Sequence, residues 1–257
     1  MDVRLEPAKS AVFNLGAASM AGEFKTNRRE VMKAGAAASA MGLIAMTGAS
    51  AIVAPNSRIR VAFMIGPSAN VIDTAGPWEV FQDFVPEGWL AKGIQTSPFE
   101  IYTVAVSREP LRMTGGLIVI PHYGYAEAPQ PNVIIVPAQQ RTEAGDLWLK
   151  AASAKADITA SICTGAFHLA RLGLLDGIAA TTHHDFYDSF ARQFPKVDLR
   201  KGRRFVDAGK IMSAGGLTSG IDLALHIVAR YFNEAEARRL AEWLEHDSPG
   251  WQNGLRA

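Results

Sequence analysis

The chain has 257 residues, enough for one α/β domain or a small pair, and its 48% apolar and 20% charged residues are typical of a globular protein. A net charge of +1 gives no basic excess that would predict nucleic acid as a partner. The single cysteine excludes an internal disulfide and a cysteine-rich zinc site.

The first 51 residues predict an export signal. Arg28 and Arg29 precede an uncharged run rich in alanine and glycine at 34–54. A basic segment, a weakly apolar segment and small residues ending at Ala51 resemble a twin-arginine signal peptide. Removal of residues 1–51 would leave a single domain over 52–257 in the periplasm.

A membrane anchor through 34–54 is the alternative interpretation of this segment. The run is long enough to span a bilayer, but its small side chains bury little apolar area. The start of translation stays open between Met1 and Met20.

Strand and helix signals alternate from residue 59 onward, because short β-rich apolar runs are separated by amphipathic runs. In chain order we expect a strand at 59–65, a helix at 76–84, a strand at 99–106, a strand or hairpin arm at 115–121, a strand at 132–138, a helix at 143–155, strands at 157–162 and 178–184 with a helix at 165–173 between them, a helix at 186–194, two strands within 204–216, and helices at 219–232 and 234–246. This order predicts a mostly parallel sheet covered on both faces, with ligands at the carboxyl ends of the strands.

The lone cysteine lies at such a strand end, within SICTG at 161–165. Small residues two positions before and two after Cys163 give the spacing of a nucleophile elbow, a sharp turn from strand to helix. The N-terminus of the following helix would favour the thiolate. The alternative is a buried core cysteine, and the spacing alone leaves both open.

Five motifs, taken together, resemble the ThiJ/PfpI superfamily in their order and spacing. They are IDTAGPWEVF at 72–81, the CTG of the elbow, GLLDG at 173–177, ATTH at 180–183 and GGLTSGIDLAL at 215–225. The branch that they resemble most contains the isonitrile hydratases and the ligand domains of AraC-type regulators. The resemblance covers about residues 58–245 and implies a flavodoxin-like, three-layer α/β sandwich of the class I glutamine amidotransferase type.

The resemblance also implies a set of site residues. Cys163 matches the family nucleophile, and Asp73 matches the carboxylate that meets the cysteine in the hydratase branch. Thr164 matches the residue after the nucleophile, and His183 matches a histidine near the cysteine in parts of the superfamily. A buried carboxyl beside a thiolate has a raised pKa and can serve as an acid and then as a base. The alternative role for Asp73 is to cap the helix expected at 76–84.

The loop after the strand at 132–138 departs from the family pattern, which is Val-Pro-Gly-Gly. Here Ala138 and Gln139 follow the proline. Alanine disfavours positive φ, so we expect another loop course, with the Gln139 side chain as a donor. We expect Gly165, Ala138, Gln139 and His183 to line the binding site.

The sequence therefore favours an enzyme: a cysteine-dependent hydratase of the isonitrile hydratase type, which converts an isocyanide and water into an N-formyl amine. The alternatives are a non-catalytic periplasmic ligand-binding or sensor domain, or a redox or carbonyl-protection protein of the same superfamily. Thr164 argues against the protease-like and glyoxalase-like branches, which usually have histidine there.

The expected partner is a small electrophile, and the resemblance implies a homodimer. Too few residues follow the last helix for a helix-turn-helix pair, so DNA is not an expected partner. No G-x-G-x-x-G motif indicates a nucleotide cofactor, and we expect no cofactor. A metal is not expected either, because no second cluster of ligands accompanies His183 and His184.

Overall fold

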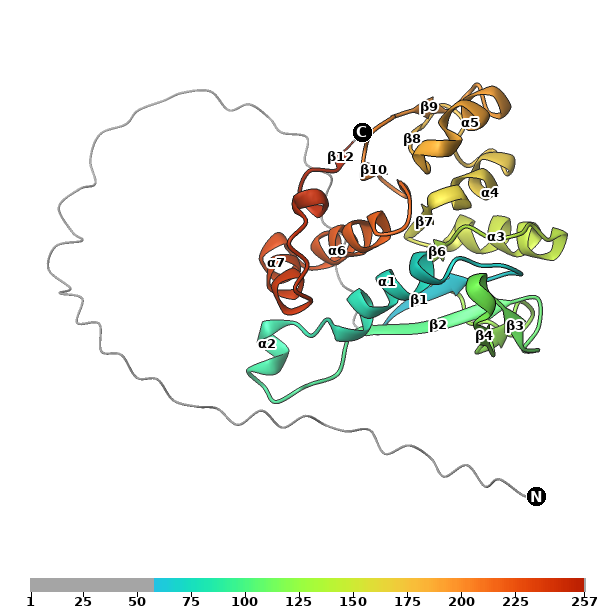
Figure 1. Cartoon of the computed structure of the whole chain (residues 1–257). Helices are drawn as coiled ribbons and strands as arrows, with labels where there is room; N and C mark the ends of the chain where they lie inside the picture. The colour runs from blue at the N-terminus through green and yellow to red at the C-terminus, as the bar shows by residue number, and fades with distance from the viewer. Residues whose placement is uncertain (1–57, 257) are drawn as a thin grey trace, which may run out of the picture. The chain divides into compact units, whose positions relative to one another are not determined.

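The computed structural model describes residues 58–256, which belong to one compact unit (Figure 1). The expected export signal at 1–51 and the alternative anchor at 34–54 lie outside the described residues. Among the helices of the described part, none is long and apolar enough to cross a membrane.

An eight-stranded sheet with the order β12-β10-β11-β7-β6-β1-β2-β5 forms the centre of the unit. Neighbouring strands are parallel, except for the antiparallel hairpin of β10 and β11. The strands are β1 (Ile59–Met64), β2 (Phe99–Ala105), β5 (Tyr123–Gly124), β6 (Val133–Val136), β7 (Ile158–Ile162), β10 (Phe205–Ala208), β11 (Ile211–Ala214) and β12 (Leu255–Arg256). Two small sheets lie outside it: β3 (Leu111–Arg112) with β4 (Ile118–Val119), and β8 (Ala179–Ala180) with β9 (Asp198–Leu199).

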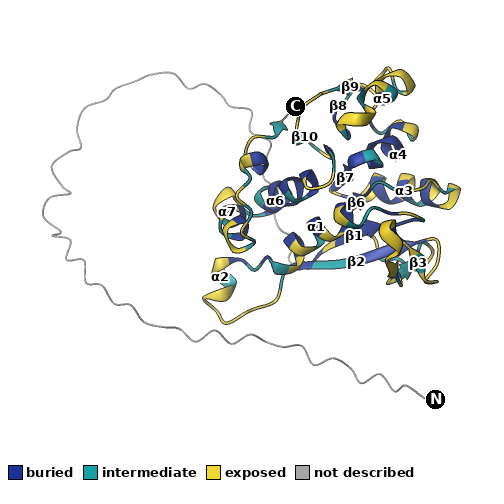
Figure 2. Ribbon diagram, viewed as in Figure 1, coloured by how far each residue is buried: buried dark blue, intermediate teal, exposed yellow. Residues whose placement is uncertain are grey.

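Both faces of the sheet are covered, because its central strands are apolar on both sides. In β6, Val133 and Ile135 enter one hydrophobic cluster, while Ile134 and Val136 enter the other. One face is covered by α1 (Val71–Asp83), α6 (Ser219–Tyr231) and α7 (Glu234–Trp243), and the other by α3 (Glu143–Lys155), α4 (Ala166–Arg171) and α5 (Tyr187–Gln193). Their inward faces are buried and their outward faces are exposed (Figure 2). The expected three-layer sandwich is confirmed.

The remaining elements are short connections. They are α2 (Glu87–Leu90), η1 (Thr114–Gly116), η2 (Cys163–Gly165), η3 (His184–Phe186) and η4 (Pro249–Trp251). The expected segment at 115–121 is the hairpin arm β4. The strand expected at 178–184 is wrong for most of its length, because the chain turns into η3 after the short β8.

The helix expected at 76–84 begins earlier than predicted, at Val71, and contains Pro77 in its interior. Asn70 is its N-cap, and its side-chain oxygen accepts from the N–H groups of Ile72 and Asp73. The alternative role of Asp73 as an N-cap is therefore wrong. Asp73 instead lies in the first turn of α1, at the end of the sheet where β1 finishes.

Candidate active site

Cys163 adopts the strained backbone that a nucleophile elbow requires. Its φ is +58°, a left-handed conformation that non-glycine residues rarely adopt. Its N–H donates to the Gly215 carbonyl at 2.7 Å, and its own carbonyl accepts from the Thr182 hydroxyl at 2.8 Å. A Cβ atom at Gly165 would lie 2.1 Å from the Val136 carbonyl oxygen, so the turn fits against β6 only with glycine there.

Asp73 presents a buried carboxylate to the elbow. The residue is 0% exposed, and its Oδ2 atom accepts from the Ala138 N–H at 3.0 Å, while Oδ1 is buried without a hydrogen-bond partner among the described residues. Burial raises the pKa of Asp73 to about 6, against the weaker lowering effect of the Ala138 and Leu217 N–H groups. Near neutral pH this carboxyl can therefore both take up and release a proton.

The Cys163 thiol holds its proton at neutral pH. Burial, and then the charge of Asp73, raise its pKa to about 11, although the Thr164 N–H, the Leu217 N–H and the Thr164 hydroxyl lower it. The sequence led us to expect a thiolate stabilised by the following helix. That expectation is wrong, because burial and the nearby carboxylate outweigh the donors, and α4 has only six residues.

The loop after β6 supplies the backbone N–H of Ala138 as a donor, whereas the Gln139 side chain binds outside the site. Neither Ala138 nor Gln139 has a positive φ, as alanine predicted. The Ala138 N–H is the donor that holds Asp73. Gln139 donates its Nε2 to the Met64 carbonyl at 3.0 Å, so this group does not serve as the free donor that we expected.

His183 contacts the site through the loop after β11. A Cβ atom at Gly216 would lie 2.1 Å from the His183 ring, so the imidazole packs directly on that backbone. The Nδ1 atom of His183 accepts from the Asp185 N–H at 3.3 Å and caps η3. Among the described residues, His183, His184 and Asp185 are the one group with possible metal-ligand atoms within 4.8 Å. The lone pair on Nδ1 of His183 is already engaged in the cap.

Leu217 is a site residue that sequence reasoning missed. Its backbone N–H faces both the thiol and the Asp73 carboxylate and lowers the pKa of each. Its φ of +51° is left-handed, which for a non-glycine residue costs about 1 kcal/mol or more. The signal lay in the GGLTSG motif, where two glycines precede an apolar residue, but a backbone donor is not visible in a search for titratable side chains.

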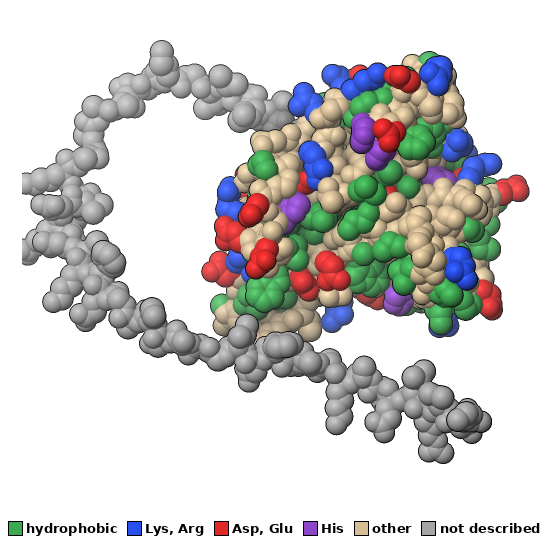
Figure 3. Space-filling model, viewed as in Figure 1, with side chains coloured by type: hydrophobic (Ala, Val, Ile, Leu, Met, Phe, Trp, Pro, Cys, Tyr) green, Lys and Arg blue, Asp and Glu red, His purple; other side chains and the backbone are tan. Residues whose placement is uncertain are grey.

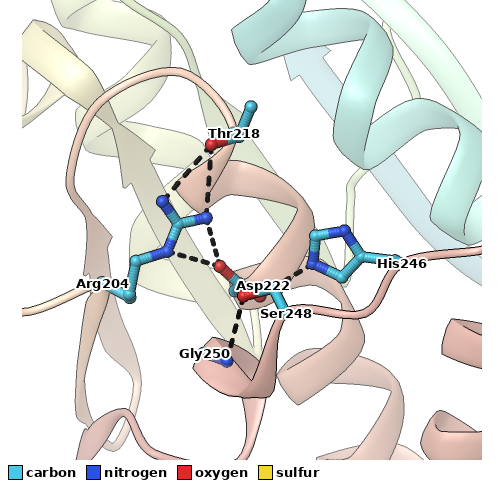
Figure 4. Close-up of polar contacts among 6 residues, drawn as sticks. All are labelled: Arg204, Thr218, Asp222, His246, Ser248 and Gly250. Carbon is cyan, nitrogen blue, oxygen red and sulfur yellow. Dashed lines mark hydrogen bonds and ion pairs between the residues drawn. The ribbon is translucent and has the colours of Figure 1, made fainter.

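The loop that carries Leu217 is fixed to α6 by a polar cluster (Figure 4). The Asp222 carboxylate is fully buried, and it accepts from Arg204 Nε at 2.6 Å and from His246 Nε2 at 2.9 Å. The guanidinium of Arg204 also donates to the Thr218 hydroxyl at 3.3 Å. Thr218 follows Leu217 directly, so this cluster holds the loop beside the elbow.

Comparisons with known proteins agree with this arrangement. Residues 59–230 match the model of the DJ-1/PfpI family. Isonitrile hydratase from Pseudomonas putida is 25% identical over 205 residues, which cover 76% of this chain and 82% of the hydratase. The HTH-type transcriptional regulator GbdR of Pseudomonas aeruginosa is 28% identical over 144 residues, which are 53% of this chain and 39% of the regulator.

A solved structure shares the fold. The crystal structure of a ThiJ/PfpI family protein from Pseudomonas syringae matches with a TM-score of 0.64 at 24% identity, over 75% of this chain and 76% of that chain. This match confirms the predicted α/β fold with a mostly parallel sheet, of the class I glutamine amidotransferase type. At this level of identity it speaks for the fold alone.

Proposed function

Since the chain belongs to the DJ-1/PfpI family, we propose that it is a cysteine-dependent hydratase that converts an isocyanide and water into an N-formyl amine. The observation that carries the proposal is the buried pair of Asp73 and Cys163, in which the carboxyl has a pKa of about 6 and the thiol one of about 11. The resemblance to isonitrile hydratase, at 25% identity, supports the same reaction.

In the first half of the proposed reaction, Asp73 acts as a base. Its carboxylate accepts the thiol proton as Sγ of Cys163 forms a bond to the terminal carbon of the isocyanide. The protonated carboxyl then gives that proton to the same carbon, which yields a thioimidate. The Thr164 and Leu217 donors, which already lower the thiol pKa, stabilise the sulfur while it carries negative charge.

In the second half, water adds to the thioimidate carbon. Asp73 accepts one proton from the water and passes it to the nitrogen, which gives a tetrahedral adduct. The carbon–sulfur bond then breaks, and the hydroxyl proton of the adduct passes through Asp73 to the sulfur as the N-formyl amine leaves. The sum is one isocyanide plus one water, with the protein unchanged. A thiol of high pKa suits the last step only if a proton donor is close, and Asp73 is that donor.

The test is turnover of alkyl and aryl isocyanides by the purified chain, followed as formamide product. We expect turnover that is lost in Cys163→Ala and in Asp73→Asn, since each lacks one half of the pair. Arg192→Gln, at an exposed position of α5, is prepared in the same way and serves as the control variant. Absence of turnover with every isocyanide would reject the hydratase proposal.

A second candidate is a non-catalytic ligand-binding module, which the similarity to the regulator GbdR favours. Such a module would bind a small molecule with no product and with no dependence on the thiol. The redox alternative receives less support, because a thiol with a pKa of about 11 is protonated and slow to react with oxidants.

We also propose that the protein is exported by the twin-arginine route. The pair Arg28-Arg29 before the uncharged segment at 34–54 supports this assignment. Replacement of both arginines by lysine should leave the full-length precursor in the cytoplasmic fraction, while the unaltered chain is recovered shortened in the periplasm. Equal recovery of both in the periplasm would reject this route.

A homodimer is the proposed assembly. Apolar side chains gather across the middle of the face in Figure 3. Leu117, Ile118 and Ile120 of the β3–β4 hairpin region are 49%, 56% and 64% exposed. An exposed apolar group of this kind favours association between protein surfaces.

A further inference from the structure

Two cavities are each lined by a residue that borders the Cys163 thiol. The first has a volume of about 600 Å³ and reaches Thr164, whose N–H and hydroxyl face the sulfur. The second, of about 380 Å³, reaches Leu217, whose N–H faces the same sulfur. Cys163 itself lines neither cavity, but each cavity is lined by a residue whose N–H borders the thiol.

The charges on the walls of both cavities have one sign. Arg141 and Arg171 line the first cavity, and Arg203 and Arg204 line the second, while among residues 58–256 no aspartate or glutamate lines either of them. The chain as a whole has a net charge of only +1, so four arginines without a lining acid are a local enrichment. A cleft with walls of one sign concentrates ligands of the opposite sign.

Two of these arginines are already neutralised, and two are not. Arg141 pairs with Asp146 at 2.5 Å, and Arg204 pairs with the buried Asp222. In the part of the chain that the structure describes, Arg171 and Arg203 have no acidic partner. Arg171 instead lies over the rings of Phe167 and Phe194, at 5.7 and 5.9 Å from their centroids. Each of the two free guanidinium groups can still bind an anionic group.

A third cavity, beside α1, is lined mainly by apolar side chains, including Val71, Met113 and Leu117, and its one charged lining residue is the acidic Glu79. An anionic group on a substrate is therefore drawn toward the arginine side, while an apolar group fits the α1 side.

We propose that the protein acts on small electrophiles that carry an anionic group, such as a carboxylate, which Arg171 or Arg203 binds while the electrophilic carbon meets Cys163. This inference names a substrate class for the proposed function and rests on Cys163 as the reacting group. It does not depend on the electrophile being an isocyanide, so it can be tested separately.

The lone cysteine makes the test direct, because every thiol label reports on Cys163. Iodoacetate and iodoacetamide alkylate a thiolate by the same displacement of iodide and differ mainly in that iodoacetate carries a negative charge. The full chain is treated with each reagent at pH 8.5 and low salt, and the label is followed by intact mass. The quantity measured is the ratio of the iodoacetate rate to the iodoacetamide rate. A changed thiol pKa alters both rates by the same factor and therefore cancels in this ratio, and the repulsion of iodoacetate by Asp73 is common to all arginine variants.

We expect the ratio to fall about three- to tenfold in the Arg171→Gln/Arg203→Gln double variant, in line with modest electrostatic steering. The fall should shrink at 0.5 M salt, where such interactions are screened. Arg192→Gln removes the same kind of charge from α5, outside the lining of both cavities, and should leave the ratio unchanged.

Three results would overturn the inference: a double variant with the ratio of Arg192→Gln, a fall that salt does not reduce, or a native thiol that neither reagent reaches. The isocyanide assay separates this outcome from the proposed function. Turnover of neutral isocyanides with an unchanged ratio would reject only the anionic substrate class. A fall in the ratio without any isocyanide turnover would reject only the hydratase reaction.

Discussion

Replacement of Asp73 by asparagine should abolish turnover and at the same time stabilise the protein. The carboxylate is 0% exposed, its Oδ1 atom is buried with no hydrogen-bond partner within the described part of the chain, and its pKa is about 6 instead of the ordinary 3.8. Asparagine has nearly the same shape and can still accept from the Ala138 N–H. The substitution therefore removes the charge with little change in packing.

The magnitude follows from the raised pKa. The folded state binds the proton more tightly than the unfolded state, so this stabilising effect is complete below pH 3.8 and is lost as the pH rises through about 6. At about 1.36 kcal/mol for each pKa unit, the ionised carboxylate costs the fold about 3 kcal/mol at neutral pH. Asp73→Asn should recover about 1–3 kcal/mol at pH 7.5, or several degrees in Tm for a domain of this size.

Urea unfolding at pH 7.5 and at pH 4 measures this effect. The advantage of Asp73→Asn over the unaltered chain should be largest at pH 7.5 and nearly absent at pH 4, where Asp73 is protonated. Iodoacetamide should also label Cys163 faster in the variant at pH 8, because loss of the neighbouring charge lowers the thiol pKa.

Asp207→Asn serves as a control, because the pKa of Asp207 is shifted in the opposite direction to that of Asp73. Burial acts to raise its pKa, but hydrogen bonds from His226 at 2.8 Å and Arg230 at 2.7 Å outweigh burial and hold the pKa at about 2. Its stabilising effect is present above pH 3.8 and lost as the pH falls through about 2, so Asp207→Asn should destabilise by about 2–3 kcal/mol at neutral pH. If Asp73→Asn lowers stability as Asp207→Asn does, or if its advantage is the same at both pH values, the account of the buried carboxylate is refuted.

Three further predictions concern the elbow and the surface. Gly165→Ala places a Cβ atom 2.1 Å from the Val136 carbonyl oxygen and should abolish turnover and lower stability by at least about 3 kcal/mol in urea unfolding, whereas an unchanged midpoint would contradict the close fit. Thr182→Val leaves the Cys163 carbonyl without its donor and should lower stability by about 1–3 kcal/mol, while Thr182→Ser should restore it. Ile118→Asp places a charge on a 56% exposed apolar position and should halve the mass seen by light scattering, unless the proposed dimer does not use the hairpin.

The sequence predicted most of the sheet because its strands are short and apolar throughout. The elbow was predictable for a local reason, since the small residues at Ser161 and Gly165 are needed by any such turn. The start of α1 was not predictable in this way: Pro77 is the second residue of the helix expected at 76–84, a position where proline is common, whereas the actual helix begins after the cap at Asn70. A proline inside a helix depends on tertiary packing that a local pattern does not contain.

The pKa values of the site were harder to predict than the residues that form it. The pairing of Cys163 with Asp73 came from the resemblance, and the structure brings both to the same end of the sheet. The direction of the thiol pKa depends on burial, which a local helix argument omits, so the expected thiolate was wrong. The role of Leu217 could not be predicted, because it contributes a backbone N–H from a left-handed conformation. A leucine in the sequence does not indicate that conformation.

The distribution of unfavourable features supports the proposed reaction at this end of the sheet. Among the described residues, four non-glycine positions have positive φ, and two of them, Cys163 and Leu217, meet at the thiol. The unpartnered Oδ1 of Asp73 lies in the same site, whereas the equally buried carboxylate of Asp222 is fully satisfied by Arg204 and His246. A fold that satisfies one buried carboxylate completely can satisfy another, so the unfavourable burial of Asp73 supports the proposal that this carboxyl exchanges its proton.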